Sequence, residues 1–198
     1  MSESLTAIGS WEFTSDHIHQ YAFIRNFLSK EECEKIIKKG KELKVKKGTI
    51  LGSVKSPIRK SNVSWIYPTS DMHWLFRRAT DGIMDLNDKF FKFDISGLHE
   101  GFQFTKYVAP SGKYGKHVDR CFEKSVRKLS LSIQLTDPKK YEGGDLKLHN
   151  GPDEDASIMS KAQGTLILFP SFILHEVTPV TKGERNSLVS WITGKPFK

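Results

Sequence analysis

Apolar side chains recur at helical spacing in two stretches of the N-terminal half. At the start of the first stretch, Ser29 and Glu32 have the spacing of a capping box, in which each side chain accepts a hydrogen bond from the other residue's backbone N–H. This pattern predicts a helix over residues 30–43. A second helix is predicted to begin near residues 70–71, because apolar residues then recur three and four positions apart and share one face. The members of this stripe, which we expect to be buried, are Leu75, Ala79, Ile83, Leu86 and Phe90.

From about Leu98 the period of the pattern changes to two. Phe102 and Phe104 alternate with polar neighbours, and a longer alternation follows in the next apolar stretch. Such alternation is typical of half-buried strands, which place successive side chains on opposite faces of a sheet. In the longer stretch, Leu129, Leu131, Ile133 and Leu135 alternate with Ser130, Ser132 and Gln134.

Two more apolar runs, at residues 164–170 and 187–192, are predicted strands, and Pro179 and the Lys182-Gly183 pair between them indicate turns. A succession of short strands predicts an antiparallel sandwich or barrel. We expect the N-terminal helices to brace one sheet of this barrel. The predicted fold class is therefore α+β, and mainly β.

The length of the chain fits one domain. Its 198 residues can share a single core, and 37% apolar residues, with 13 Phe, 5 Tyr and 4 Trp, supply enough large side chains for one. No internal repeat or linker divides the sequence. We expect a single domain over residues 1–198, in which a helical or mixed part at about 1–97 supports a strand-rich core at about 98–198.

Neither a membrane segment nor a signal peptide is indicated. No apolar run approaches the roughly 20 residues that cross a bilayer, and the first residues lack a basic region followed by an apolar stretch. We therefore expect a cytoplasmic protein without a membrane partner. Cys33 and Cys121 are too few for a disulfide framework and are expected to be reduced thiols. The oligomeric state is unknown from these patterns.

The net charge of +8 is concentrated in lysines between Lys35 and Lys47. A solvated helix face is the favoured interpretation, and a surface that docks nucleic acid or another polyanion is the alternative. No aromatic residues interleave this run, so the stacking platform that single-stranded nucleic acid uses is missing there.

The chemically informative residues begin with His117 and Asp119. Residues two apart in a strand point to the same side, so both could bind one metal while Val118 faces the core. His175 follows an apolar strand, and a barrel could bring it opposite this pair. Two imidazoles and one carboxylate leave three adjacent positions open, the arrangement associated with non-haem Fe(II) oxygenases. A bidentate 2-oxoacid and dioxygen can occupy these positions.

Arg185 stands ten residues after His175, at the start of the next predicted strand. A guanidinium there can hold a carboxylate through two parallel charge-assisted hydrogen bonds, as the distal end of 2-oxoglutarate requires. Ser187, two residues on, faces the same side and could donate another hydrogen bond. Alone, Arg185 could equally be half of a salt bridge at the barrel rim, and the His-X-Asp tripeptide could be a surface pair.

Together these segments resemble a known family. YVAPSGKYGKHVD, LSLSIQLTDPKKYEGGDLKLH, GTLILFPSFILHEVTPVTKGER and SLVSW are similar to the PKHD-type hydroxylases and, more distantly, to prolyl 4-hydroxylases and oxygen-sensing prolyl hydroxylases. These belong to the 2-oxoglutarate/Fe(II) oxygenase superfamily. The resemblance covers about Gly101 to Trp191 and implies a double-stranded β-helix, a jelly-roll or cupin-like barrel. It also implies that His117, Asp119 and His175 bind iron and that Arg185 binds the oxoglutarate carboxylate.

The resemblance implies further cofactor contacts. Tyr107 matches a tyrosine that lies against oxoglutarate in relatives, and Gln134 stands where oxygen-sensing enzymes use a tyrosine for the distal carboxylate. Collagen-type enzymes have lysine in place of Arg185, so this chain is closer to the other groups. PKHD-type members often carry an extra C-terminal segment, whereas this chain ends seven residues after Trp191.

Four residues are candidates for substrate contact. Arg59 and Trp65 lie in a segment where relatives place substrate-side strands and loops. Tyr114 could flank the substrate entrance or plug the mouth of the barrel. Trp191 could form a wall of the iron pocket or belong to the core.

The resemblance implies a dioxygenase that uses Fe(II), 2-oxoglutarate and O2, with ascorbate as reductant, to hydroxylate a C–H bond and release succinate and CO2. A prolyl residue in a protein or peptide is the favoured substrate. The alternatives are an oxygenase acting on nucleic acid, as the charge suggests, or on a small molecule, and a jelly-roll module that binds metal and ligand without turnover.

Overall fold

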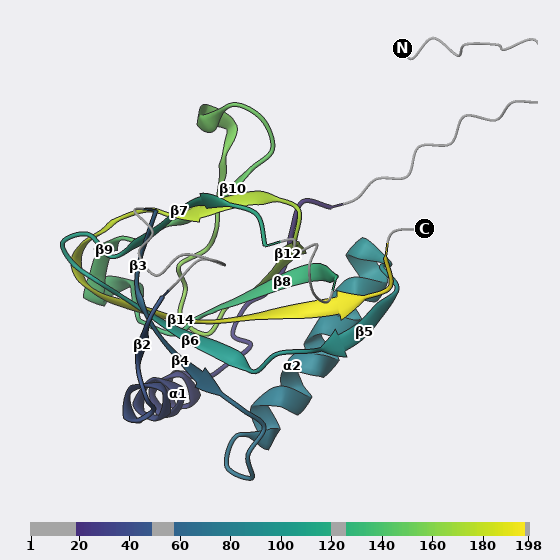
Figure 1. Ribbon diagram of the computed structural model, residues 1–198, viewed down its shortest axis with the longest axis horizontal. Coiled ribbons are helices and arrows are strands. Elements are labelled where there is room, and N and C mark those ends of the chain that lie inside the picture. The colour runs from purple at the N-terminus through teal and green to yellow at the C-terminus, as the bar shows by residue number, and fades with distance from the viewer. Residues whose placement is uncertain (1–18, 49–57, 120–125, 197–198) are drawn as a thin grey trace, which may run out of the picture.

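Two antiparallel sheets face each other, and the helices cover only the outer face of the larger one (Figure 1). The computed structural model describes residues 19–48, 58–119 and 126–196. Within these ranges the predicted fold, α+β, mainly β and built as a double-stranded β-helix, is confirmed.

The larger sheet has nine strands and runs in the order β1-β12-β8-β14-β6-β4-β2, with β5 and β9 also paired to β14. Its long central strands β8, β14 and β6 form the floor of the barrel. The strands are β1 (Ala22–Ile24), β2 (Lys46–Lys47), β4 (Asn62–Ile66), β5 (Ile95–Leu98), β6 (Phe102–Val108), β8 (Arg127–Gln134), β9 (Tyr141–Gly143), β12 (Leu166–Pro170) and β14 (Val180–Gly194).

The smaller sheet has five strands in the order β11-β10-β13-β7-β3. Neither α1 (Lys30–Glu42) nor α2 (His73–Leu86) covers its outer face (Figure 1). Its strands are β3 (Arg59–Lys60), β7 (Lys113–His117), β10 (Leu146–His149), β11 (Ser157–Ile158) and β13 (Leu174–Val177).

Helices α1 and α2 both lie on the side of the larger sheet that faces away from the smaller one (Figure 1), and the ion pair between Arg78 and Glu32 links them. The predicted capping box of α1 is confirmed, since the Ser29 N–H donates to Glu32 Oε2 at 2.8 Å and the Glu32 N–H donates to Ser29 Oγ at 3.2 Å. None of the described helices is long and apolar enough to cross a membrane. The helices are α1 (Lys30–Glu42), α2 (His73–Leu86), the π-helix η1 (Asn87–Phe91) and the 3-10 helices η2 (Pro138–Lys140) and η3 (Asp153–Asp155).

The apolar stripe of α2 is buried against the sheet through Leu86, but its predicted last member is not. Phe90 is only partly buried, and Phe91 is 5% exposed in its place. The cause is the π-helix η1, because its wider i→i+5 turns rotate the following side chains relative to an α-helix. The prediction of Phe90 as the buried position was therefore wrong by one residue.

Strand β8 is buried on both faces, whereas its alternation predicted a half-buried strand. The apolar side chains pack toward the helices, and Ser130, Ser132 and Gln134 are 1%, 5% and 2% exposed. The polar side chains point between the two sheets, so their face lines the barrel interior instead of meeting solvent. A polar interior of this kind is typical of a binding site rather than of a packed core.

Strand β14 continues through the predicted turn at Lys182 and Gly183. Gly183 has φ +76°, and the register of β14 with β9 shifts between Val180 and Lys182. The shift is a β-bulge, and the strand passes from β9 to β6 directly after Gly183. Lys182 and Gly183 thus mark a change in backbone direction, as predicted, but strand β14 bends there and does not end.

Cys33 is buried in α1 and is a free thiol, as predicted. Burial, with smaller contributions from neighbouring acidic residues, raises the pKa of this thiol to about 12. A protonated buried thiol is chemically inert. The corresponding prediction for Cys121 lies outside the described residues.

Gly40 is where α1 approaches the sheet most closely, since a Cβ there would lie 2.3 Å from Cγ of the Phe104 ring. We expect Gly40→Ala to destabilise the fold by about 1–3 kcal/mol. Helix propensity favours Ala over Gly by roughly 1 kcal/mol, but the cost of overpacking against Phe104 outweighs this gain. Chemical denaturation measures the effect.

The matched control is Gly82→Ala in α2. There the nearest atoms are the side-chain ends of Phe27 and Ile24, at 3.2 and 3.3 Å, which can move aside. We expect Gly82→Ala to lower the free energy of unfolding less than Gly40→Ala does. A Gly40→Ala protein as stable as the wild type would contradict this view of the helix–sheet contact.

Candidate metal centre and carboxylate pocket

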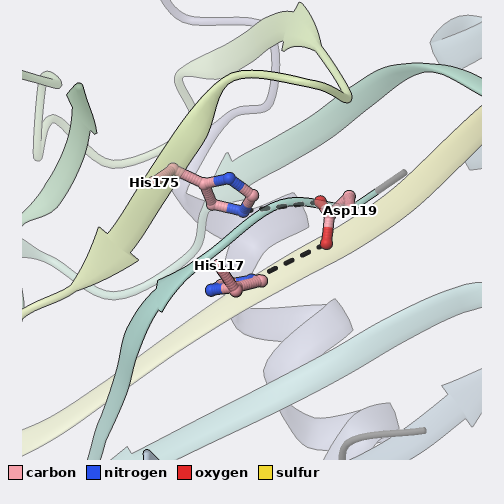
Figure 2. Close-up of side chains that lie close together, drawn as sticks. All are labelled: His117, Asp119 and His175. Atoms are coloured by element: carbon pink, nitrogen blue, oxygen red, sulfur yellow. Dashed lines mark ion pairs between the residues drawn. The ribbon is translucent and has the colours of Figure 1, made fainter. Parts of the chain in front are cut away.

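His117, Asp119 and His175 come together between the two sheets. His117 ends β7, His175 lies in β13, and the two histidines face each other in the register of these neighbouring strands. One ligand atom from each of the three residues lies within 4.8 Å of the others. Figure 2 shows the three side chains pointing toward one another. The structure thus brings together residues that are up to 58 positions apart in the sequence.

Backbone carbonyls orient both imidazoles. His117 Nδ1 lies 2.8 Å from the Gly115 carbonyl oxygen, and His175 Nδ1 lies 2.9 Å from that of Ile173. Each contact favours the tautomer with its proton on Nδ1, which leaves the Nε2 lone pair free. The two Nε2 atoms face the Asp119 carboxylate, at 3.6 Å from Oδ1 for His117 and 3.4 Å from Oδ2 for His175.

The protonation states of these groups suit a metal site. Burial by itself would raise the pKa of Asp119, but the charges and hydrogen bonding of His175 and His117 hold it well below its usual value. Burial, and next the charge of His175, lower the pKa of His117 to about 4. Burial would also lower the pKa of His175, yet Asp119 outweighs it and raises that pKa. Asp119 and His117 are thus deprotonated, as metal ligands must be, and a cation that binds here has to displace the proton that Asp119 favours on His175.

Val118 does not face the core, contrary to the sequence-based prediction. Its side chain is 48% exposed. His117 and Asp119 point into the barrel, so the residue between them points outward, where the smaller sheet meets solvent.

Arg185 lies in a buried polar pocket further along the barrel and is 1% exposed. Its Nη2 donates to Gln134 Oε1 at 2.9 Å, its Nη1 donates to Ser187 Oγ at 3.4 Å, and its guanidinium carbon lies 5.3 Å from the Tyr107 ring centre. The four residues predicted to surround the carboxylate are thus in contact. Gly144 completes the pocket, because a Cβ there would lie 2.9 Å from Arg185 Cδ.

Within the described ranges, no protein carboxylate balances the charge of Arg185. Its Nε has no hydrogen-bond partner, and among the described residues no Asp or Glu forms an ion pair with it. A buried, unpaired cation is costly. This pocket is therefore chemically complementary to a small dicarboxylate whose far end lies against Arg185.

Tyr114 and Arg59 form one side of the metal cluster. The Tyr114 ring stacks on the His117 ring with 3.5 Å between centres, and the Arg59 guanidinium lies 4.4 Å from the Tyr114 ring centre. Arg59 Nη2 also donates to Gln103 Oε1 at 2.6 Å, which joins the smaller sheet to the larger one. Tyr114 is half-buried beside the cluster, a position consistent with the entrance that was one of its two predicted roles.

Trp191 lies on another side of the cluster, and the ring of Trp65 lies near it, with 6.4 Å between the two ring centres. Trp191 is 7% exposed, and its indole lies near enough to Asp119 to help lower the pKa of that carboxyl, after the larger effects of burial and the histidines. It therefore packs in the interior and also borders the metal cluster, and its contact with substrate stays a prediction.

Two residues at the cluster were not predicted. The Arg127 guanidinium lies 3.8 Å from the Trp191 ring centre and donates to Glu100 Oε1 at 2.5 Å. Ser130 Oγ donates to Asp119 Oδ2 at 2.8 Å. The polar face of the β8 alternation could have indicated Ser130, whereas no local pattern marks Arg127.

The fold and this cluster define a class: double-stranded β-helix proteins with a two-histidine, one-carboxylate site, as in non-haem Fe(II) oxygenases. Residues 102–193 match a family model described as the 2OG-Fe(II) oxygenase superfamily. This match places that part of the chain in the superfamily and confirms the resemblance seen in its motifs.

Similar proteins agree with this placement. A PKHD-type hydroxylase of Synechococcus is 42% identical over 80 residues, 40% of this chain and 36% of the relative. Another, from Prochlorococcus marinus, is 39% identical over 101 residues, 50% of this chain and 44% of the relative. The matched segments thus span less than half the length of these curated relatives.

Solved structures share the fold. A Pseudomonas putida prolyl-4-hydroxylase has a TM-score of 0.72 at 20% identity, covering 90% of this chain and 94% of that one. A Trichoplax adhaerens prolyl hydroxylase, solved with a peptide fragment of hypoxia inducible factor, has a TM-score of 0.71 at 20% identity, covering 88% and 84%.

The residues present fit the two cofactors that the superfamily's description names. Two neutral imidazoles and one carboxylate suit a divalent iron ion with open positions. The unpaired guanidinium of Arg185 suits a carboxylate of 2-oxoglutarate.

Proposed function

We propose that this protein is an Fe(II)- and 2-oxoglutarate-dependent dioxygenase that hydroxylates a prolyl residue in a protein or peptide. The observation that carries the proposal is a buried arginine, without a carboxylate partner among the residues placed by the structure, in the same barrel as two histidines and an aspartate. Either feature alone could be structural. Together, the cluster provides ligands for a metal and the arginine provides a cation for the distal carboxylate of an oxoacid bound to that metal.

Each residue has a defined role in this proposal. His117, Asp119 and His175 hold the metal, and Arg185, positioned by Gln134 and Ser187, binds the distal carboxylate of 2-oxoglutarate beside Tyr107. When bound, iron and 2-oxoglutarate supply the oxidising power that inserts one oxygen atom of O2 into a C–H bond and leaves succinate and CO2.

The protein's own contribution is to place and shield the substrate. Aromatic and cationic side chains border the metal cluster at Tyr114, Arg59 and Trp191, and Trp65 lies next to Trp191. Such walls hold an apolar ring close to the metal while they exclude water. The prolyl assignment draws support from the names of the two structural neighbours described above, which are prolyl hydroxylases, one of them solved with a peptide.

The experiment supplies the purified protein with Fe(II), ascorbate, 2-oxoglutarate and a library of proline-containing peptides. We expect succinate, and a peptide that gains one oxygen atom on proline, with the label of ¹⁸O2 incorporated. Omission of 2-oxoglutarate should abolish both products.

The outcomes separate the parts of the proposal. Oxygen added only to another residue, or only to an oligonucleotide, would contradict the prolyl assignment and leave the oxygenase standing. Metal and 2-oxoglutarate binding with no succinate, for any substrate, would favour the non-catalytic binding module.

A further inference from the structure

Asp119 has less support from its own strand than either histidine. Strand β7 ends at His117, and Asp119 takes no part in the pairing of β7 with β13. Asp119 is held instead by hydrogen bonds to Ser130, in strand β8 of the larger sheet, and to Ser171, the residue after strand β12. The Asp119 N–H donates to the Ser171 carbonyl oxygen at 3.0 Å, and Asp119 Oδ2 accepts from Ser130 Oγ at 2.8 Å.

The two serines are also joined to each other. Ser130 Oγ and Ser171 Oγ lie 2.9 Å apart, and they are 1% and 0% exposed. An ionised carboxylate only accepts hydrogen bonds, so the single hydroxyl proton of Ser130 points to Asp119. The hydroxyl of Ser171 must then donate to Ser130, which gives one direction to the chain from Ser171 through Ser130 to Asp119.

We propose that Ser130, supported by Ser171, is a positioning residue that holds the Asp119 carboxylate in its metal-binding orientation. This inference rests on the proposed role of Asp119 as a metal ligand. Hydrogen bonds in series polarise one another, and the bond to a carboxylate is charge-assisted, so this chain strongly favours one orientation of the side chain. Water cannot take over the role of Ser130, because both hydroxyls are buried.

The position of Ser130 explains the polar face of β8. Ser130 and Gln134 lie four residues apart on the face that lines the barrel, and they hydrogen-bond Asp119 and Arg185 respectively. One strand thus orients the carboxylate proposed for the metal and the guanidinium proposed for oxoglutarate. A rigid strand that carries both supports fixes the distance between the two parts of the site.

The test measures metal binding, without turnover, in Ser130→Ala, Ser130→Thr and Ser64→Ala. Co(II) is the probe, and calorimetry and its visible absorption bands report affinity and geometry. Ser64 is the matched control, because it is a buried serine whose hydroxyl donates to the Gly40 carbonyl oxygen at 2.7 Å, toward α1 and away from the metal cluster.

We expect Ser130→Ala to weaken Co(II) binding by about 10–100-fold and to change the absorption bands, as loss of residues that support metal ligands does. Ser130→Thr retains the hydroxyl and should restore most of the affinity. Ser64→Ala should bind Co(II) as the wild type does, even if thermal unfolding shows a similar loss of stability.

Wild-type affinity in Ser130→Ala, or an equal loss in Ser64→Ala, would overturn the inference while leaving the metal site in place. If Ser130→Ala does not fold, Ser171→Ala replaces it in the test. Unaltered Co(II) affinity in Ser171→Ala would contradict the hydrogen-bond chain from Ser171 through Ser130 to Asp119. Failure of the wild type to bind Co(II) would overturn both the inference and the proposed metal centre.

Discussion

Replacing Asp119 with alanine is expected to abolish turnover, with a loss of more than the 10–100-fold that removing a mere supporting residue costs. Asp119 is the only carboxylate in the cluster among the residues that the structure describes, and its two oxygens face both histidines. Two neutral imidazoles alone provide neither the third ligand nor the negative charge that a divalent cation requires. Succinate formation in the presence of a substrate peptide measures the effect, and calorimetry with Fe(II) under argon measures metal affinity.

The matched control is Asp153→Ala. Asp153 lies on the outer side of the smaller sheet, paired with Lys116, and its side chain is 70% exposed. A surface ion pair contributes about 0–1 kcal/mol, so this variant should retain wild-type turnover and metal affinity. Full turnover in Asp119→Ala would refute the assignment of the metal centre, provided that thermal unfolding shows a folded variant.

Replacing Arg185 with methionine is expected to weaken 2-oxoglutarate binding by about 2–5 kcal/mol, which corresponds to at least about 30-fold in the dissociation constant. The guanidinium is buried and provides the cation of the pocket. Without it, the distal carboxylate of the oxoacid would be desolvated and left without a charged partner. Titration of the metal-loaded protein in the absence of O2 measures the affinity.

The same variant should not lose stability when no oxoacid is bound. Arg185 has an unpaired Nε and no carboxylate partner among the described residues, and apolar side chains of similar volume often stabilise a protein at such positions. We therefore expect an unchanged or higher melting temperature for the free variant, and a much smaller rise on addition of 2-oxoglutarate.

Arg78→Met serves as the control, because Arg78 pairs with Glu32 on the surface of α2. This change should affect neither oxoacid affinity nor its stabilising effect. A free Arg185→Met protein that unfolds several kcal/mol more easily would indicate that the arginine serves the fold, and unchanged affinity would exclude it from the oxoglutarate site.

The sequence predicted the elements best where local physics decides them. The capping box at Ser29 set the start of α1, and the helical spacing of apolar residues identified the buried face of α2 as far as Leu86. Both depend on contacts within a few residues. The prediction failed at Phe90. A change from α- to π-helix follows from packing against the sheet, and the spacing of apolar residues in the sequence does not reveal it.

The polar face of β8 shows a different limit. Alternation of apolar and polar residues reports that the two faces of a strand differ, but not whether the polar face meets water or a second sheet. For the same reason Val118 was expected inside and lies outside. Only the closure of the barrel distinguishes its interior from its outer surface.

The amino-acid sequence by itself determined the class of fold, the His-X-Asp pair and the chemical types of the other site residues, since period and side-chain chemistry are local properties. The tertiary structure alone decided which of them meet. It placed His175 opposite His117, left Arg185 without a carboxylate partner in the part of the chain that the structure describes, and brought Ser130 to Asp119. These outcomes depend on strand register and sheet closure. Both arise from the summed packing of the whole chain, so no single segment of the sequence determines them.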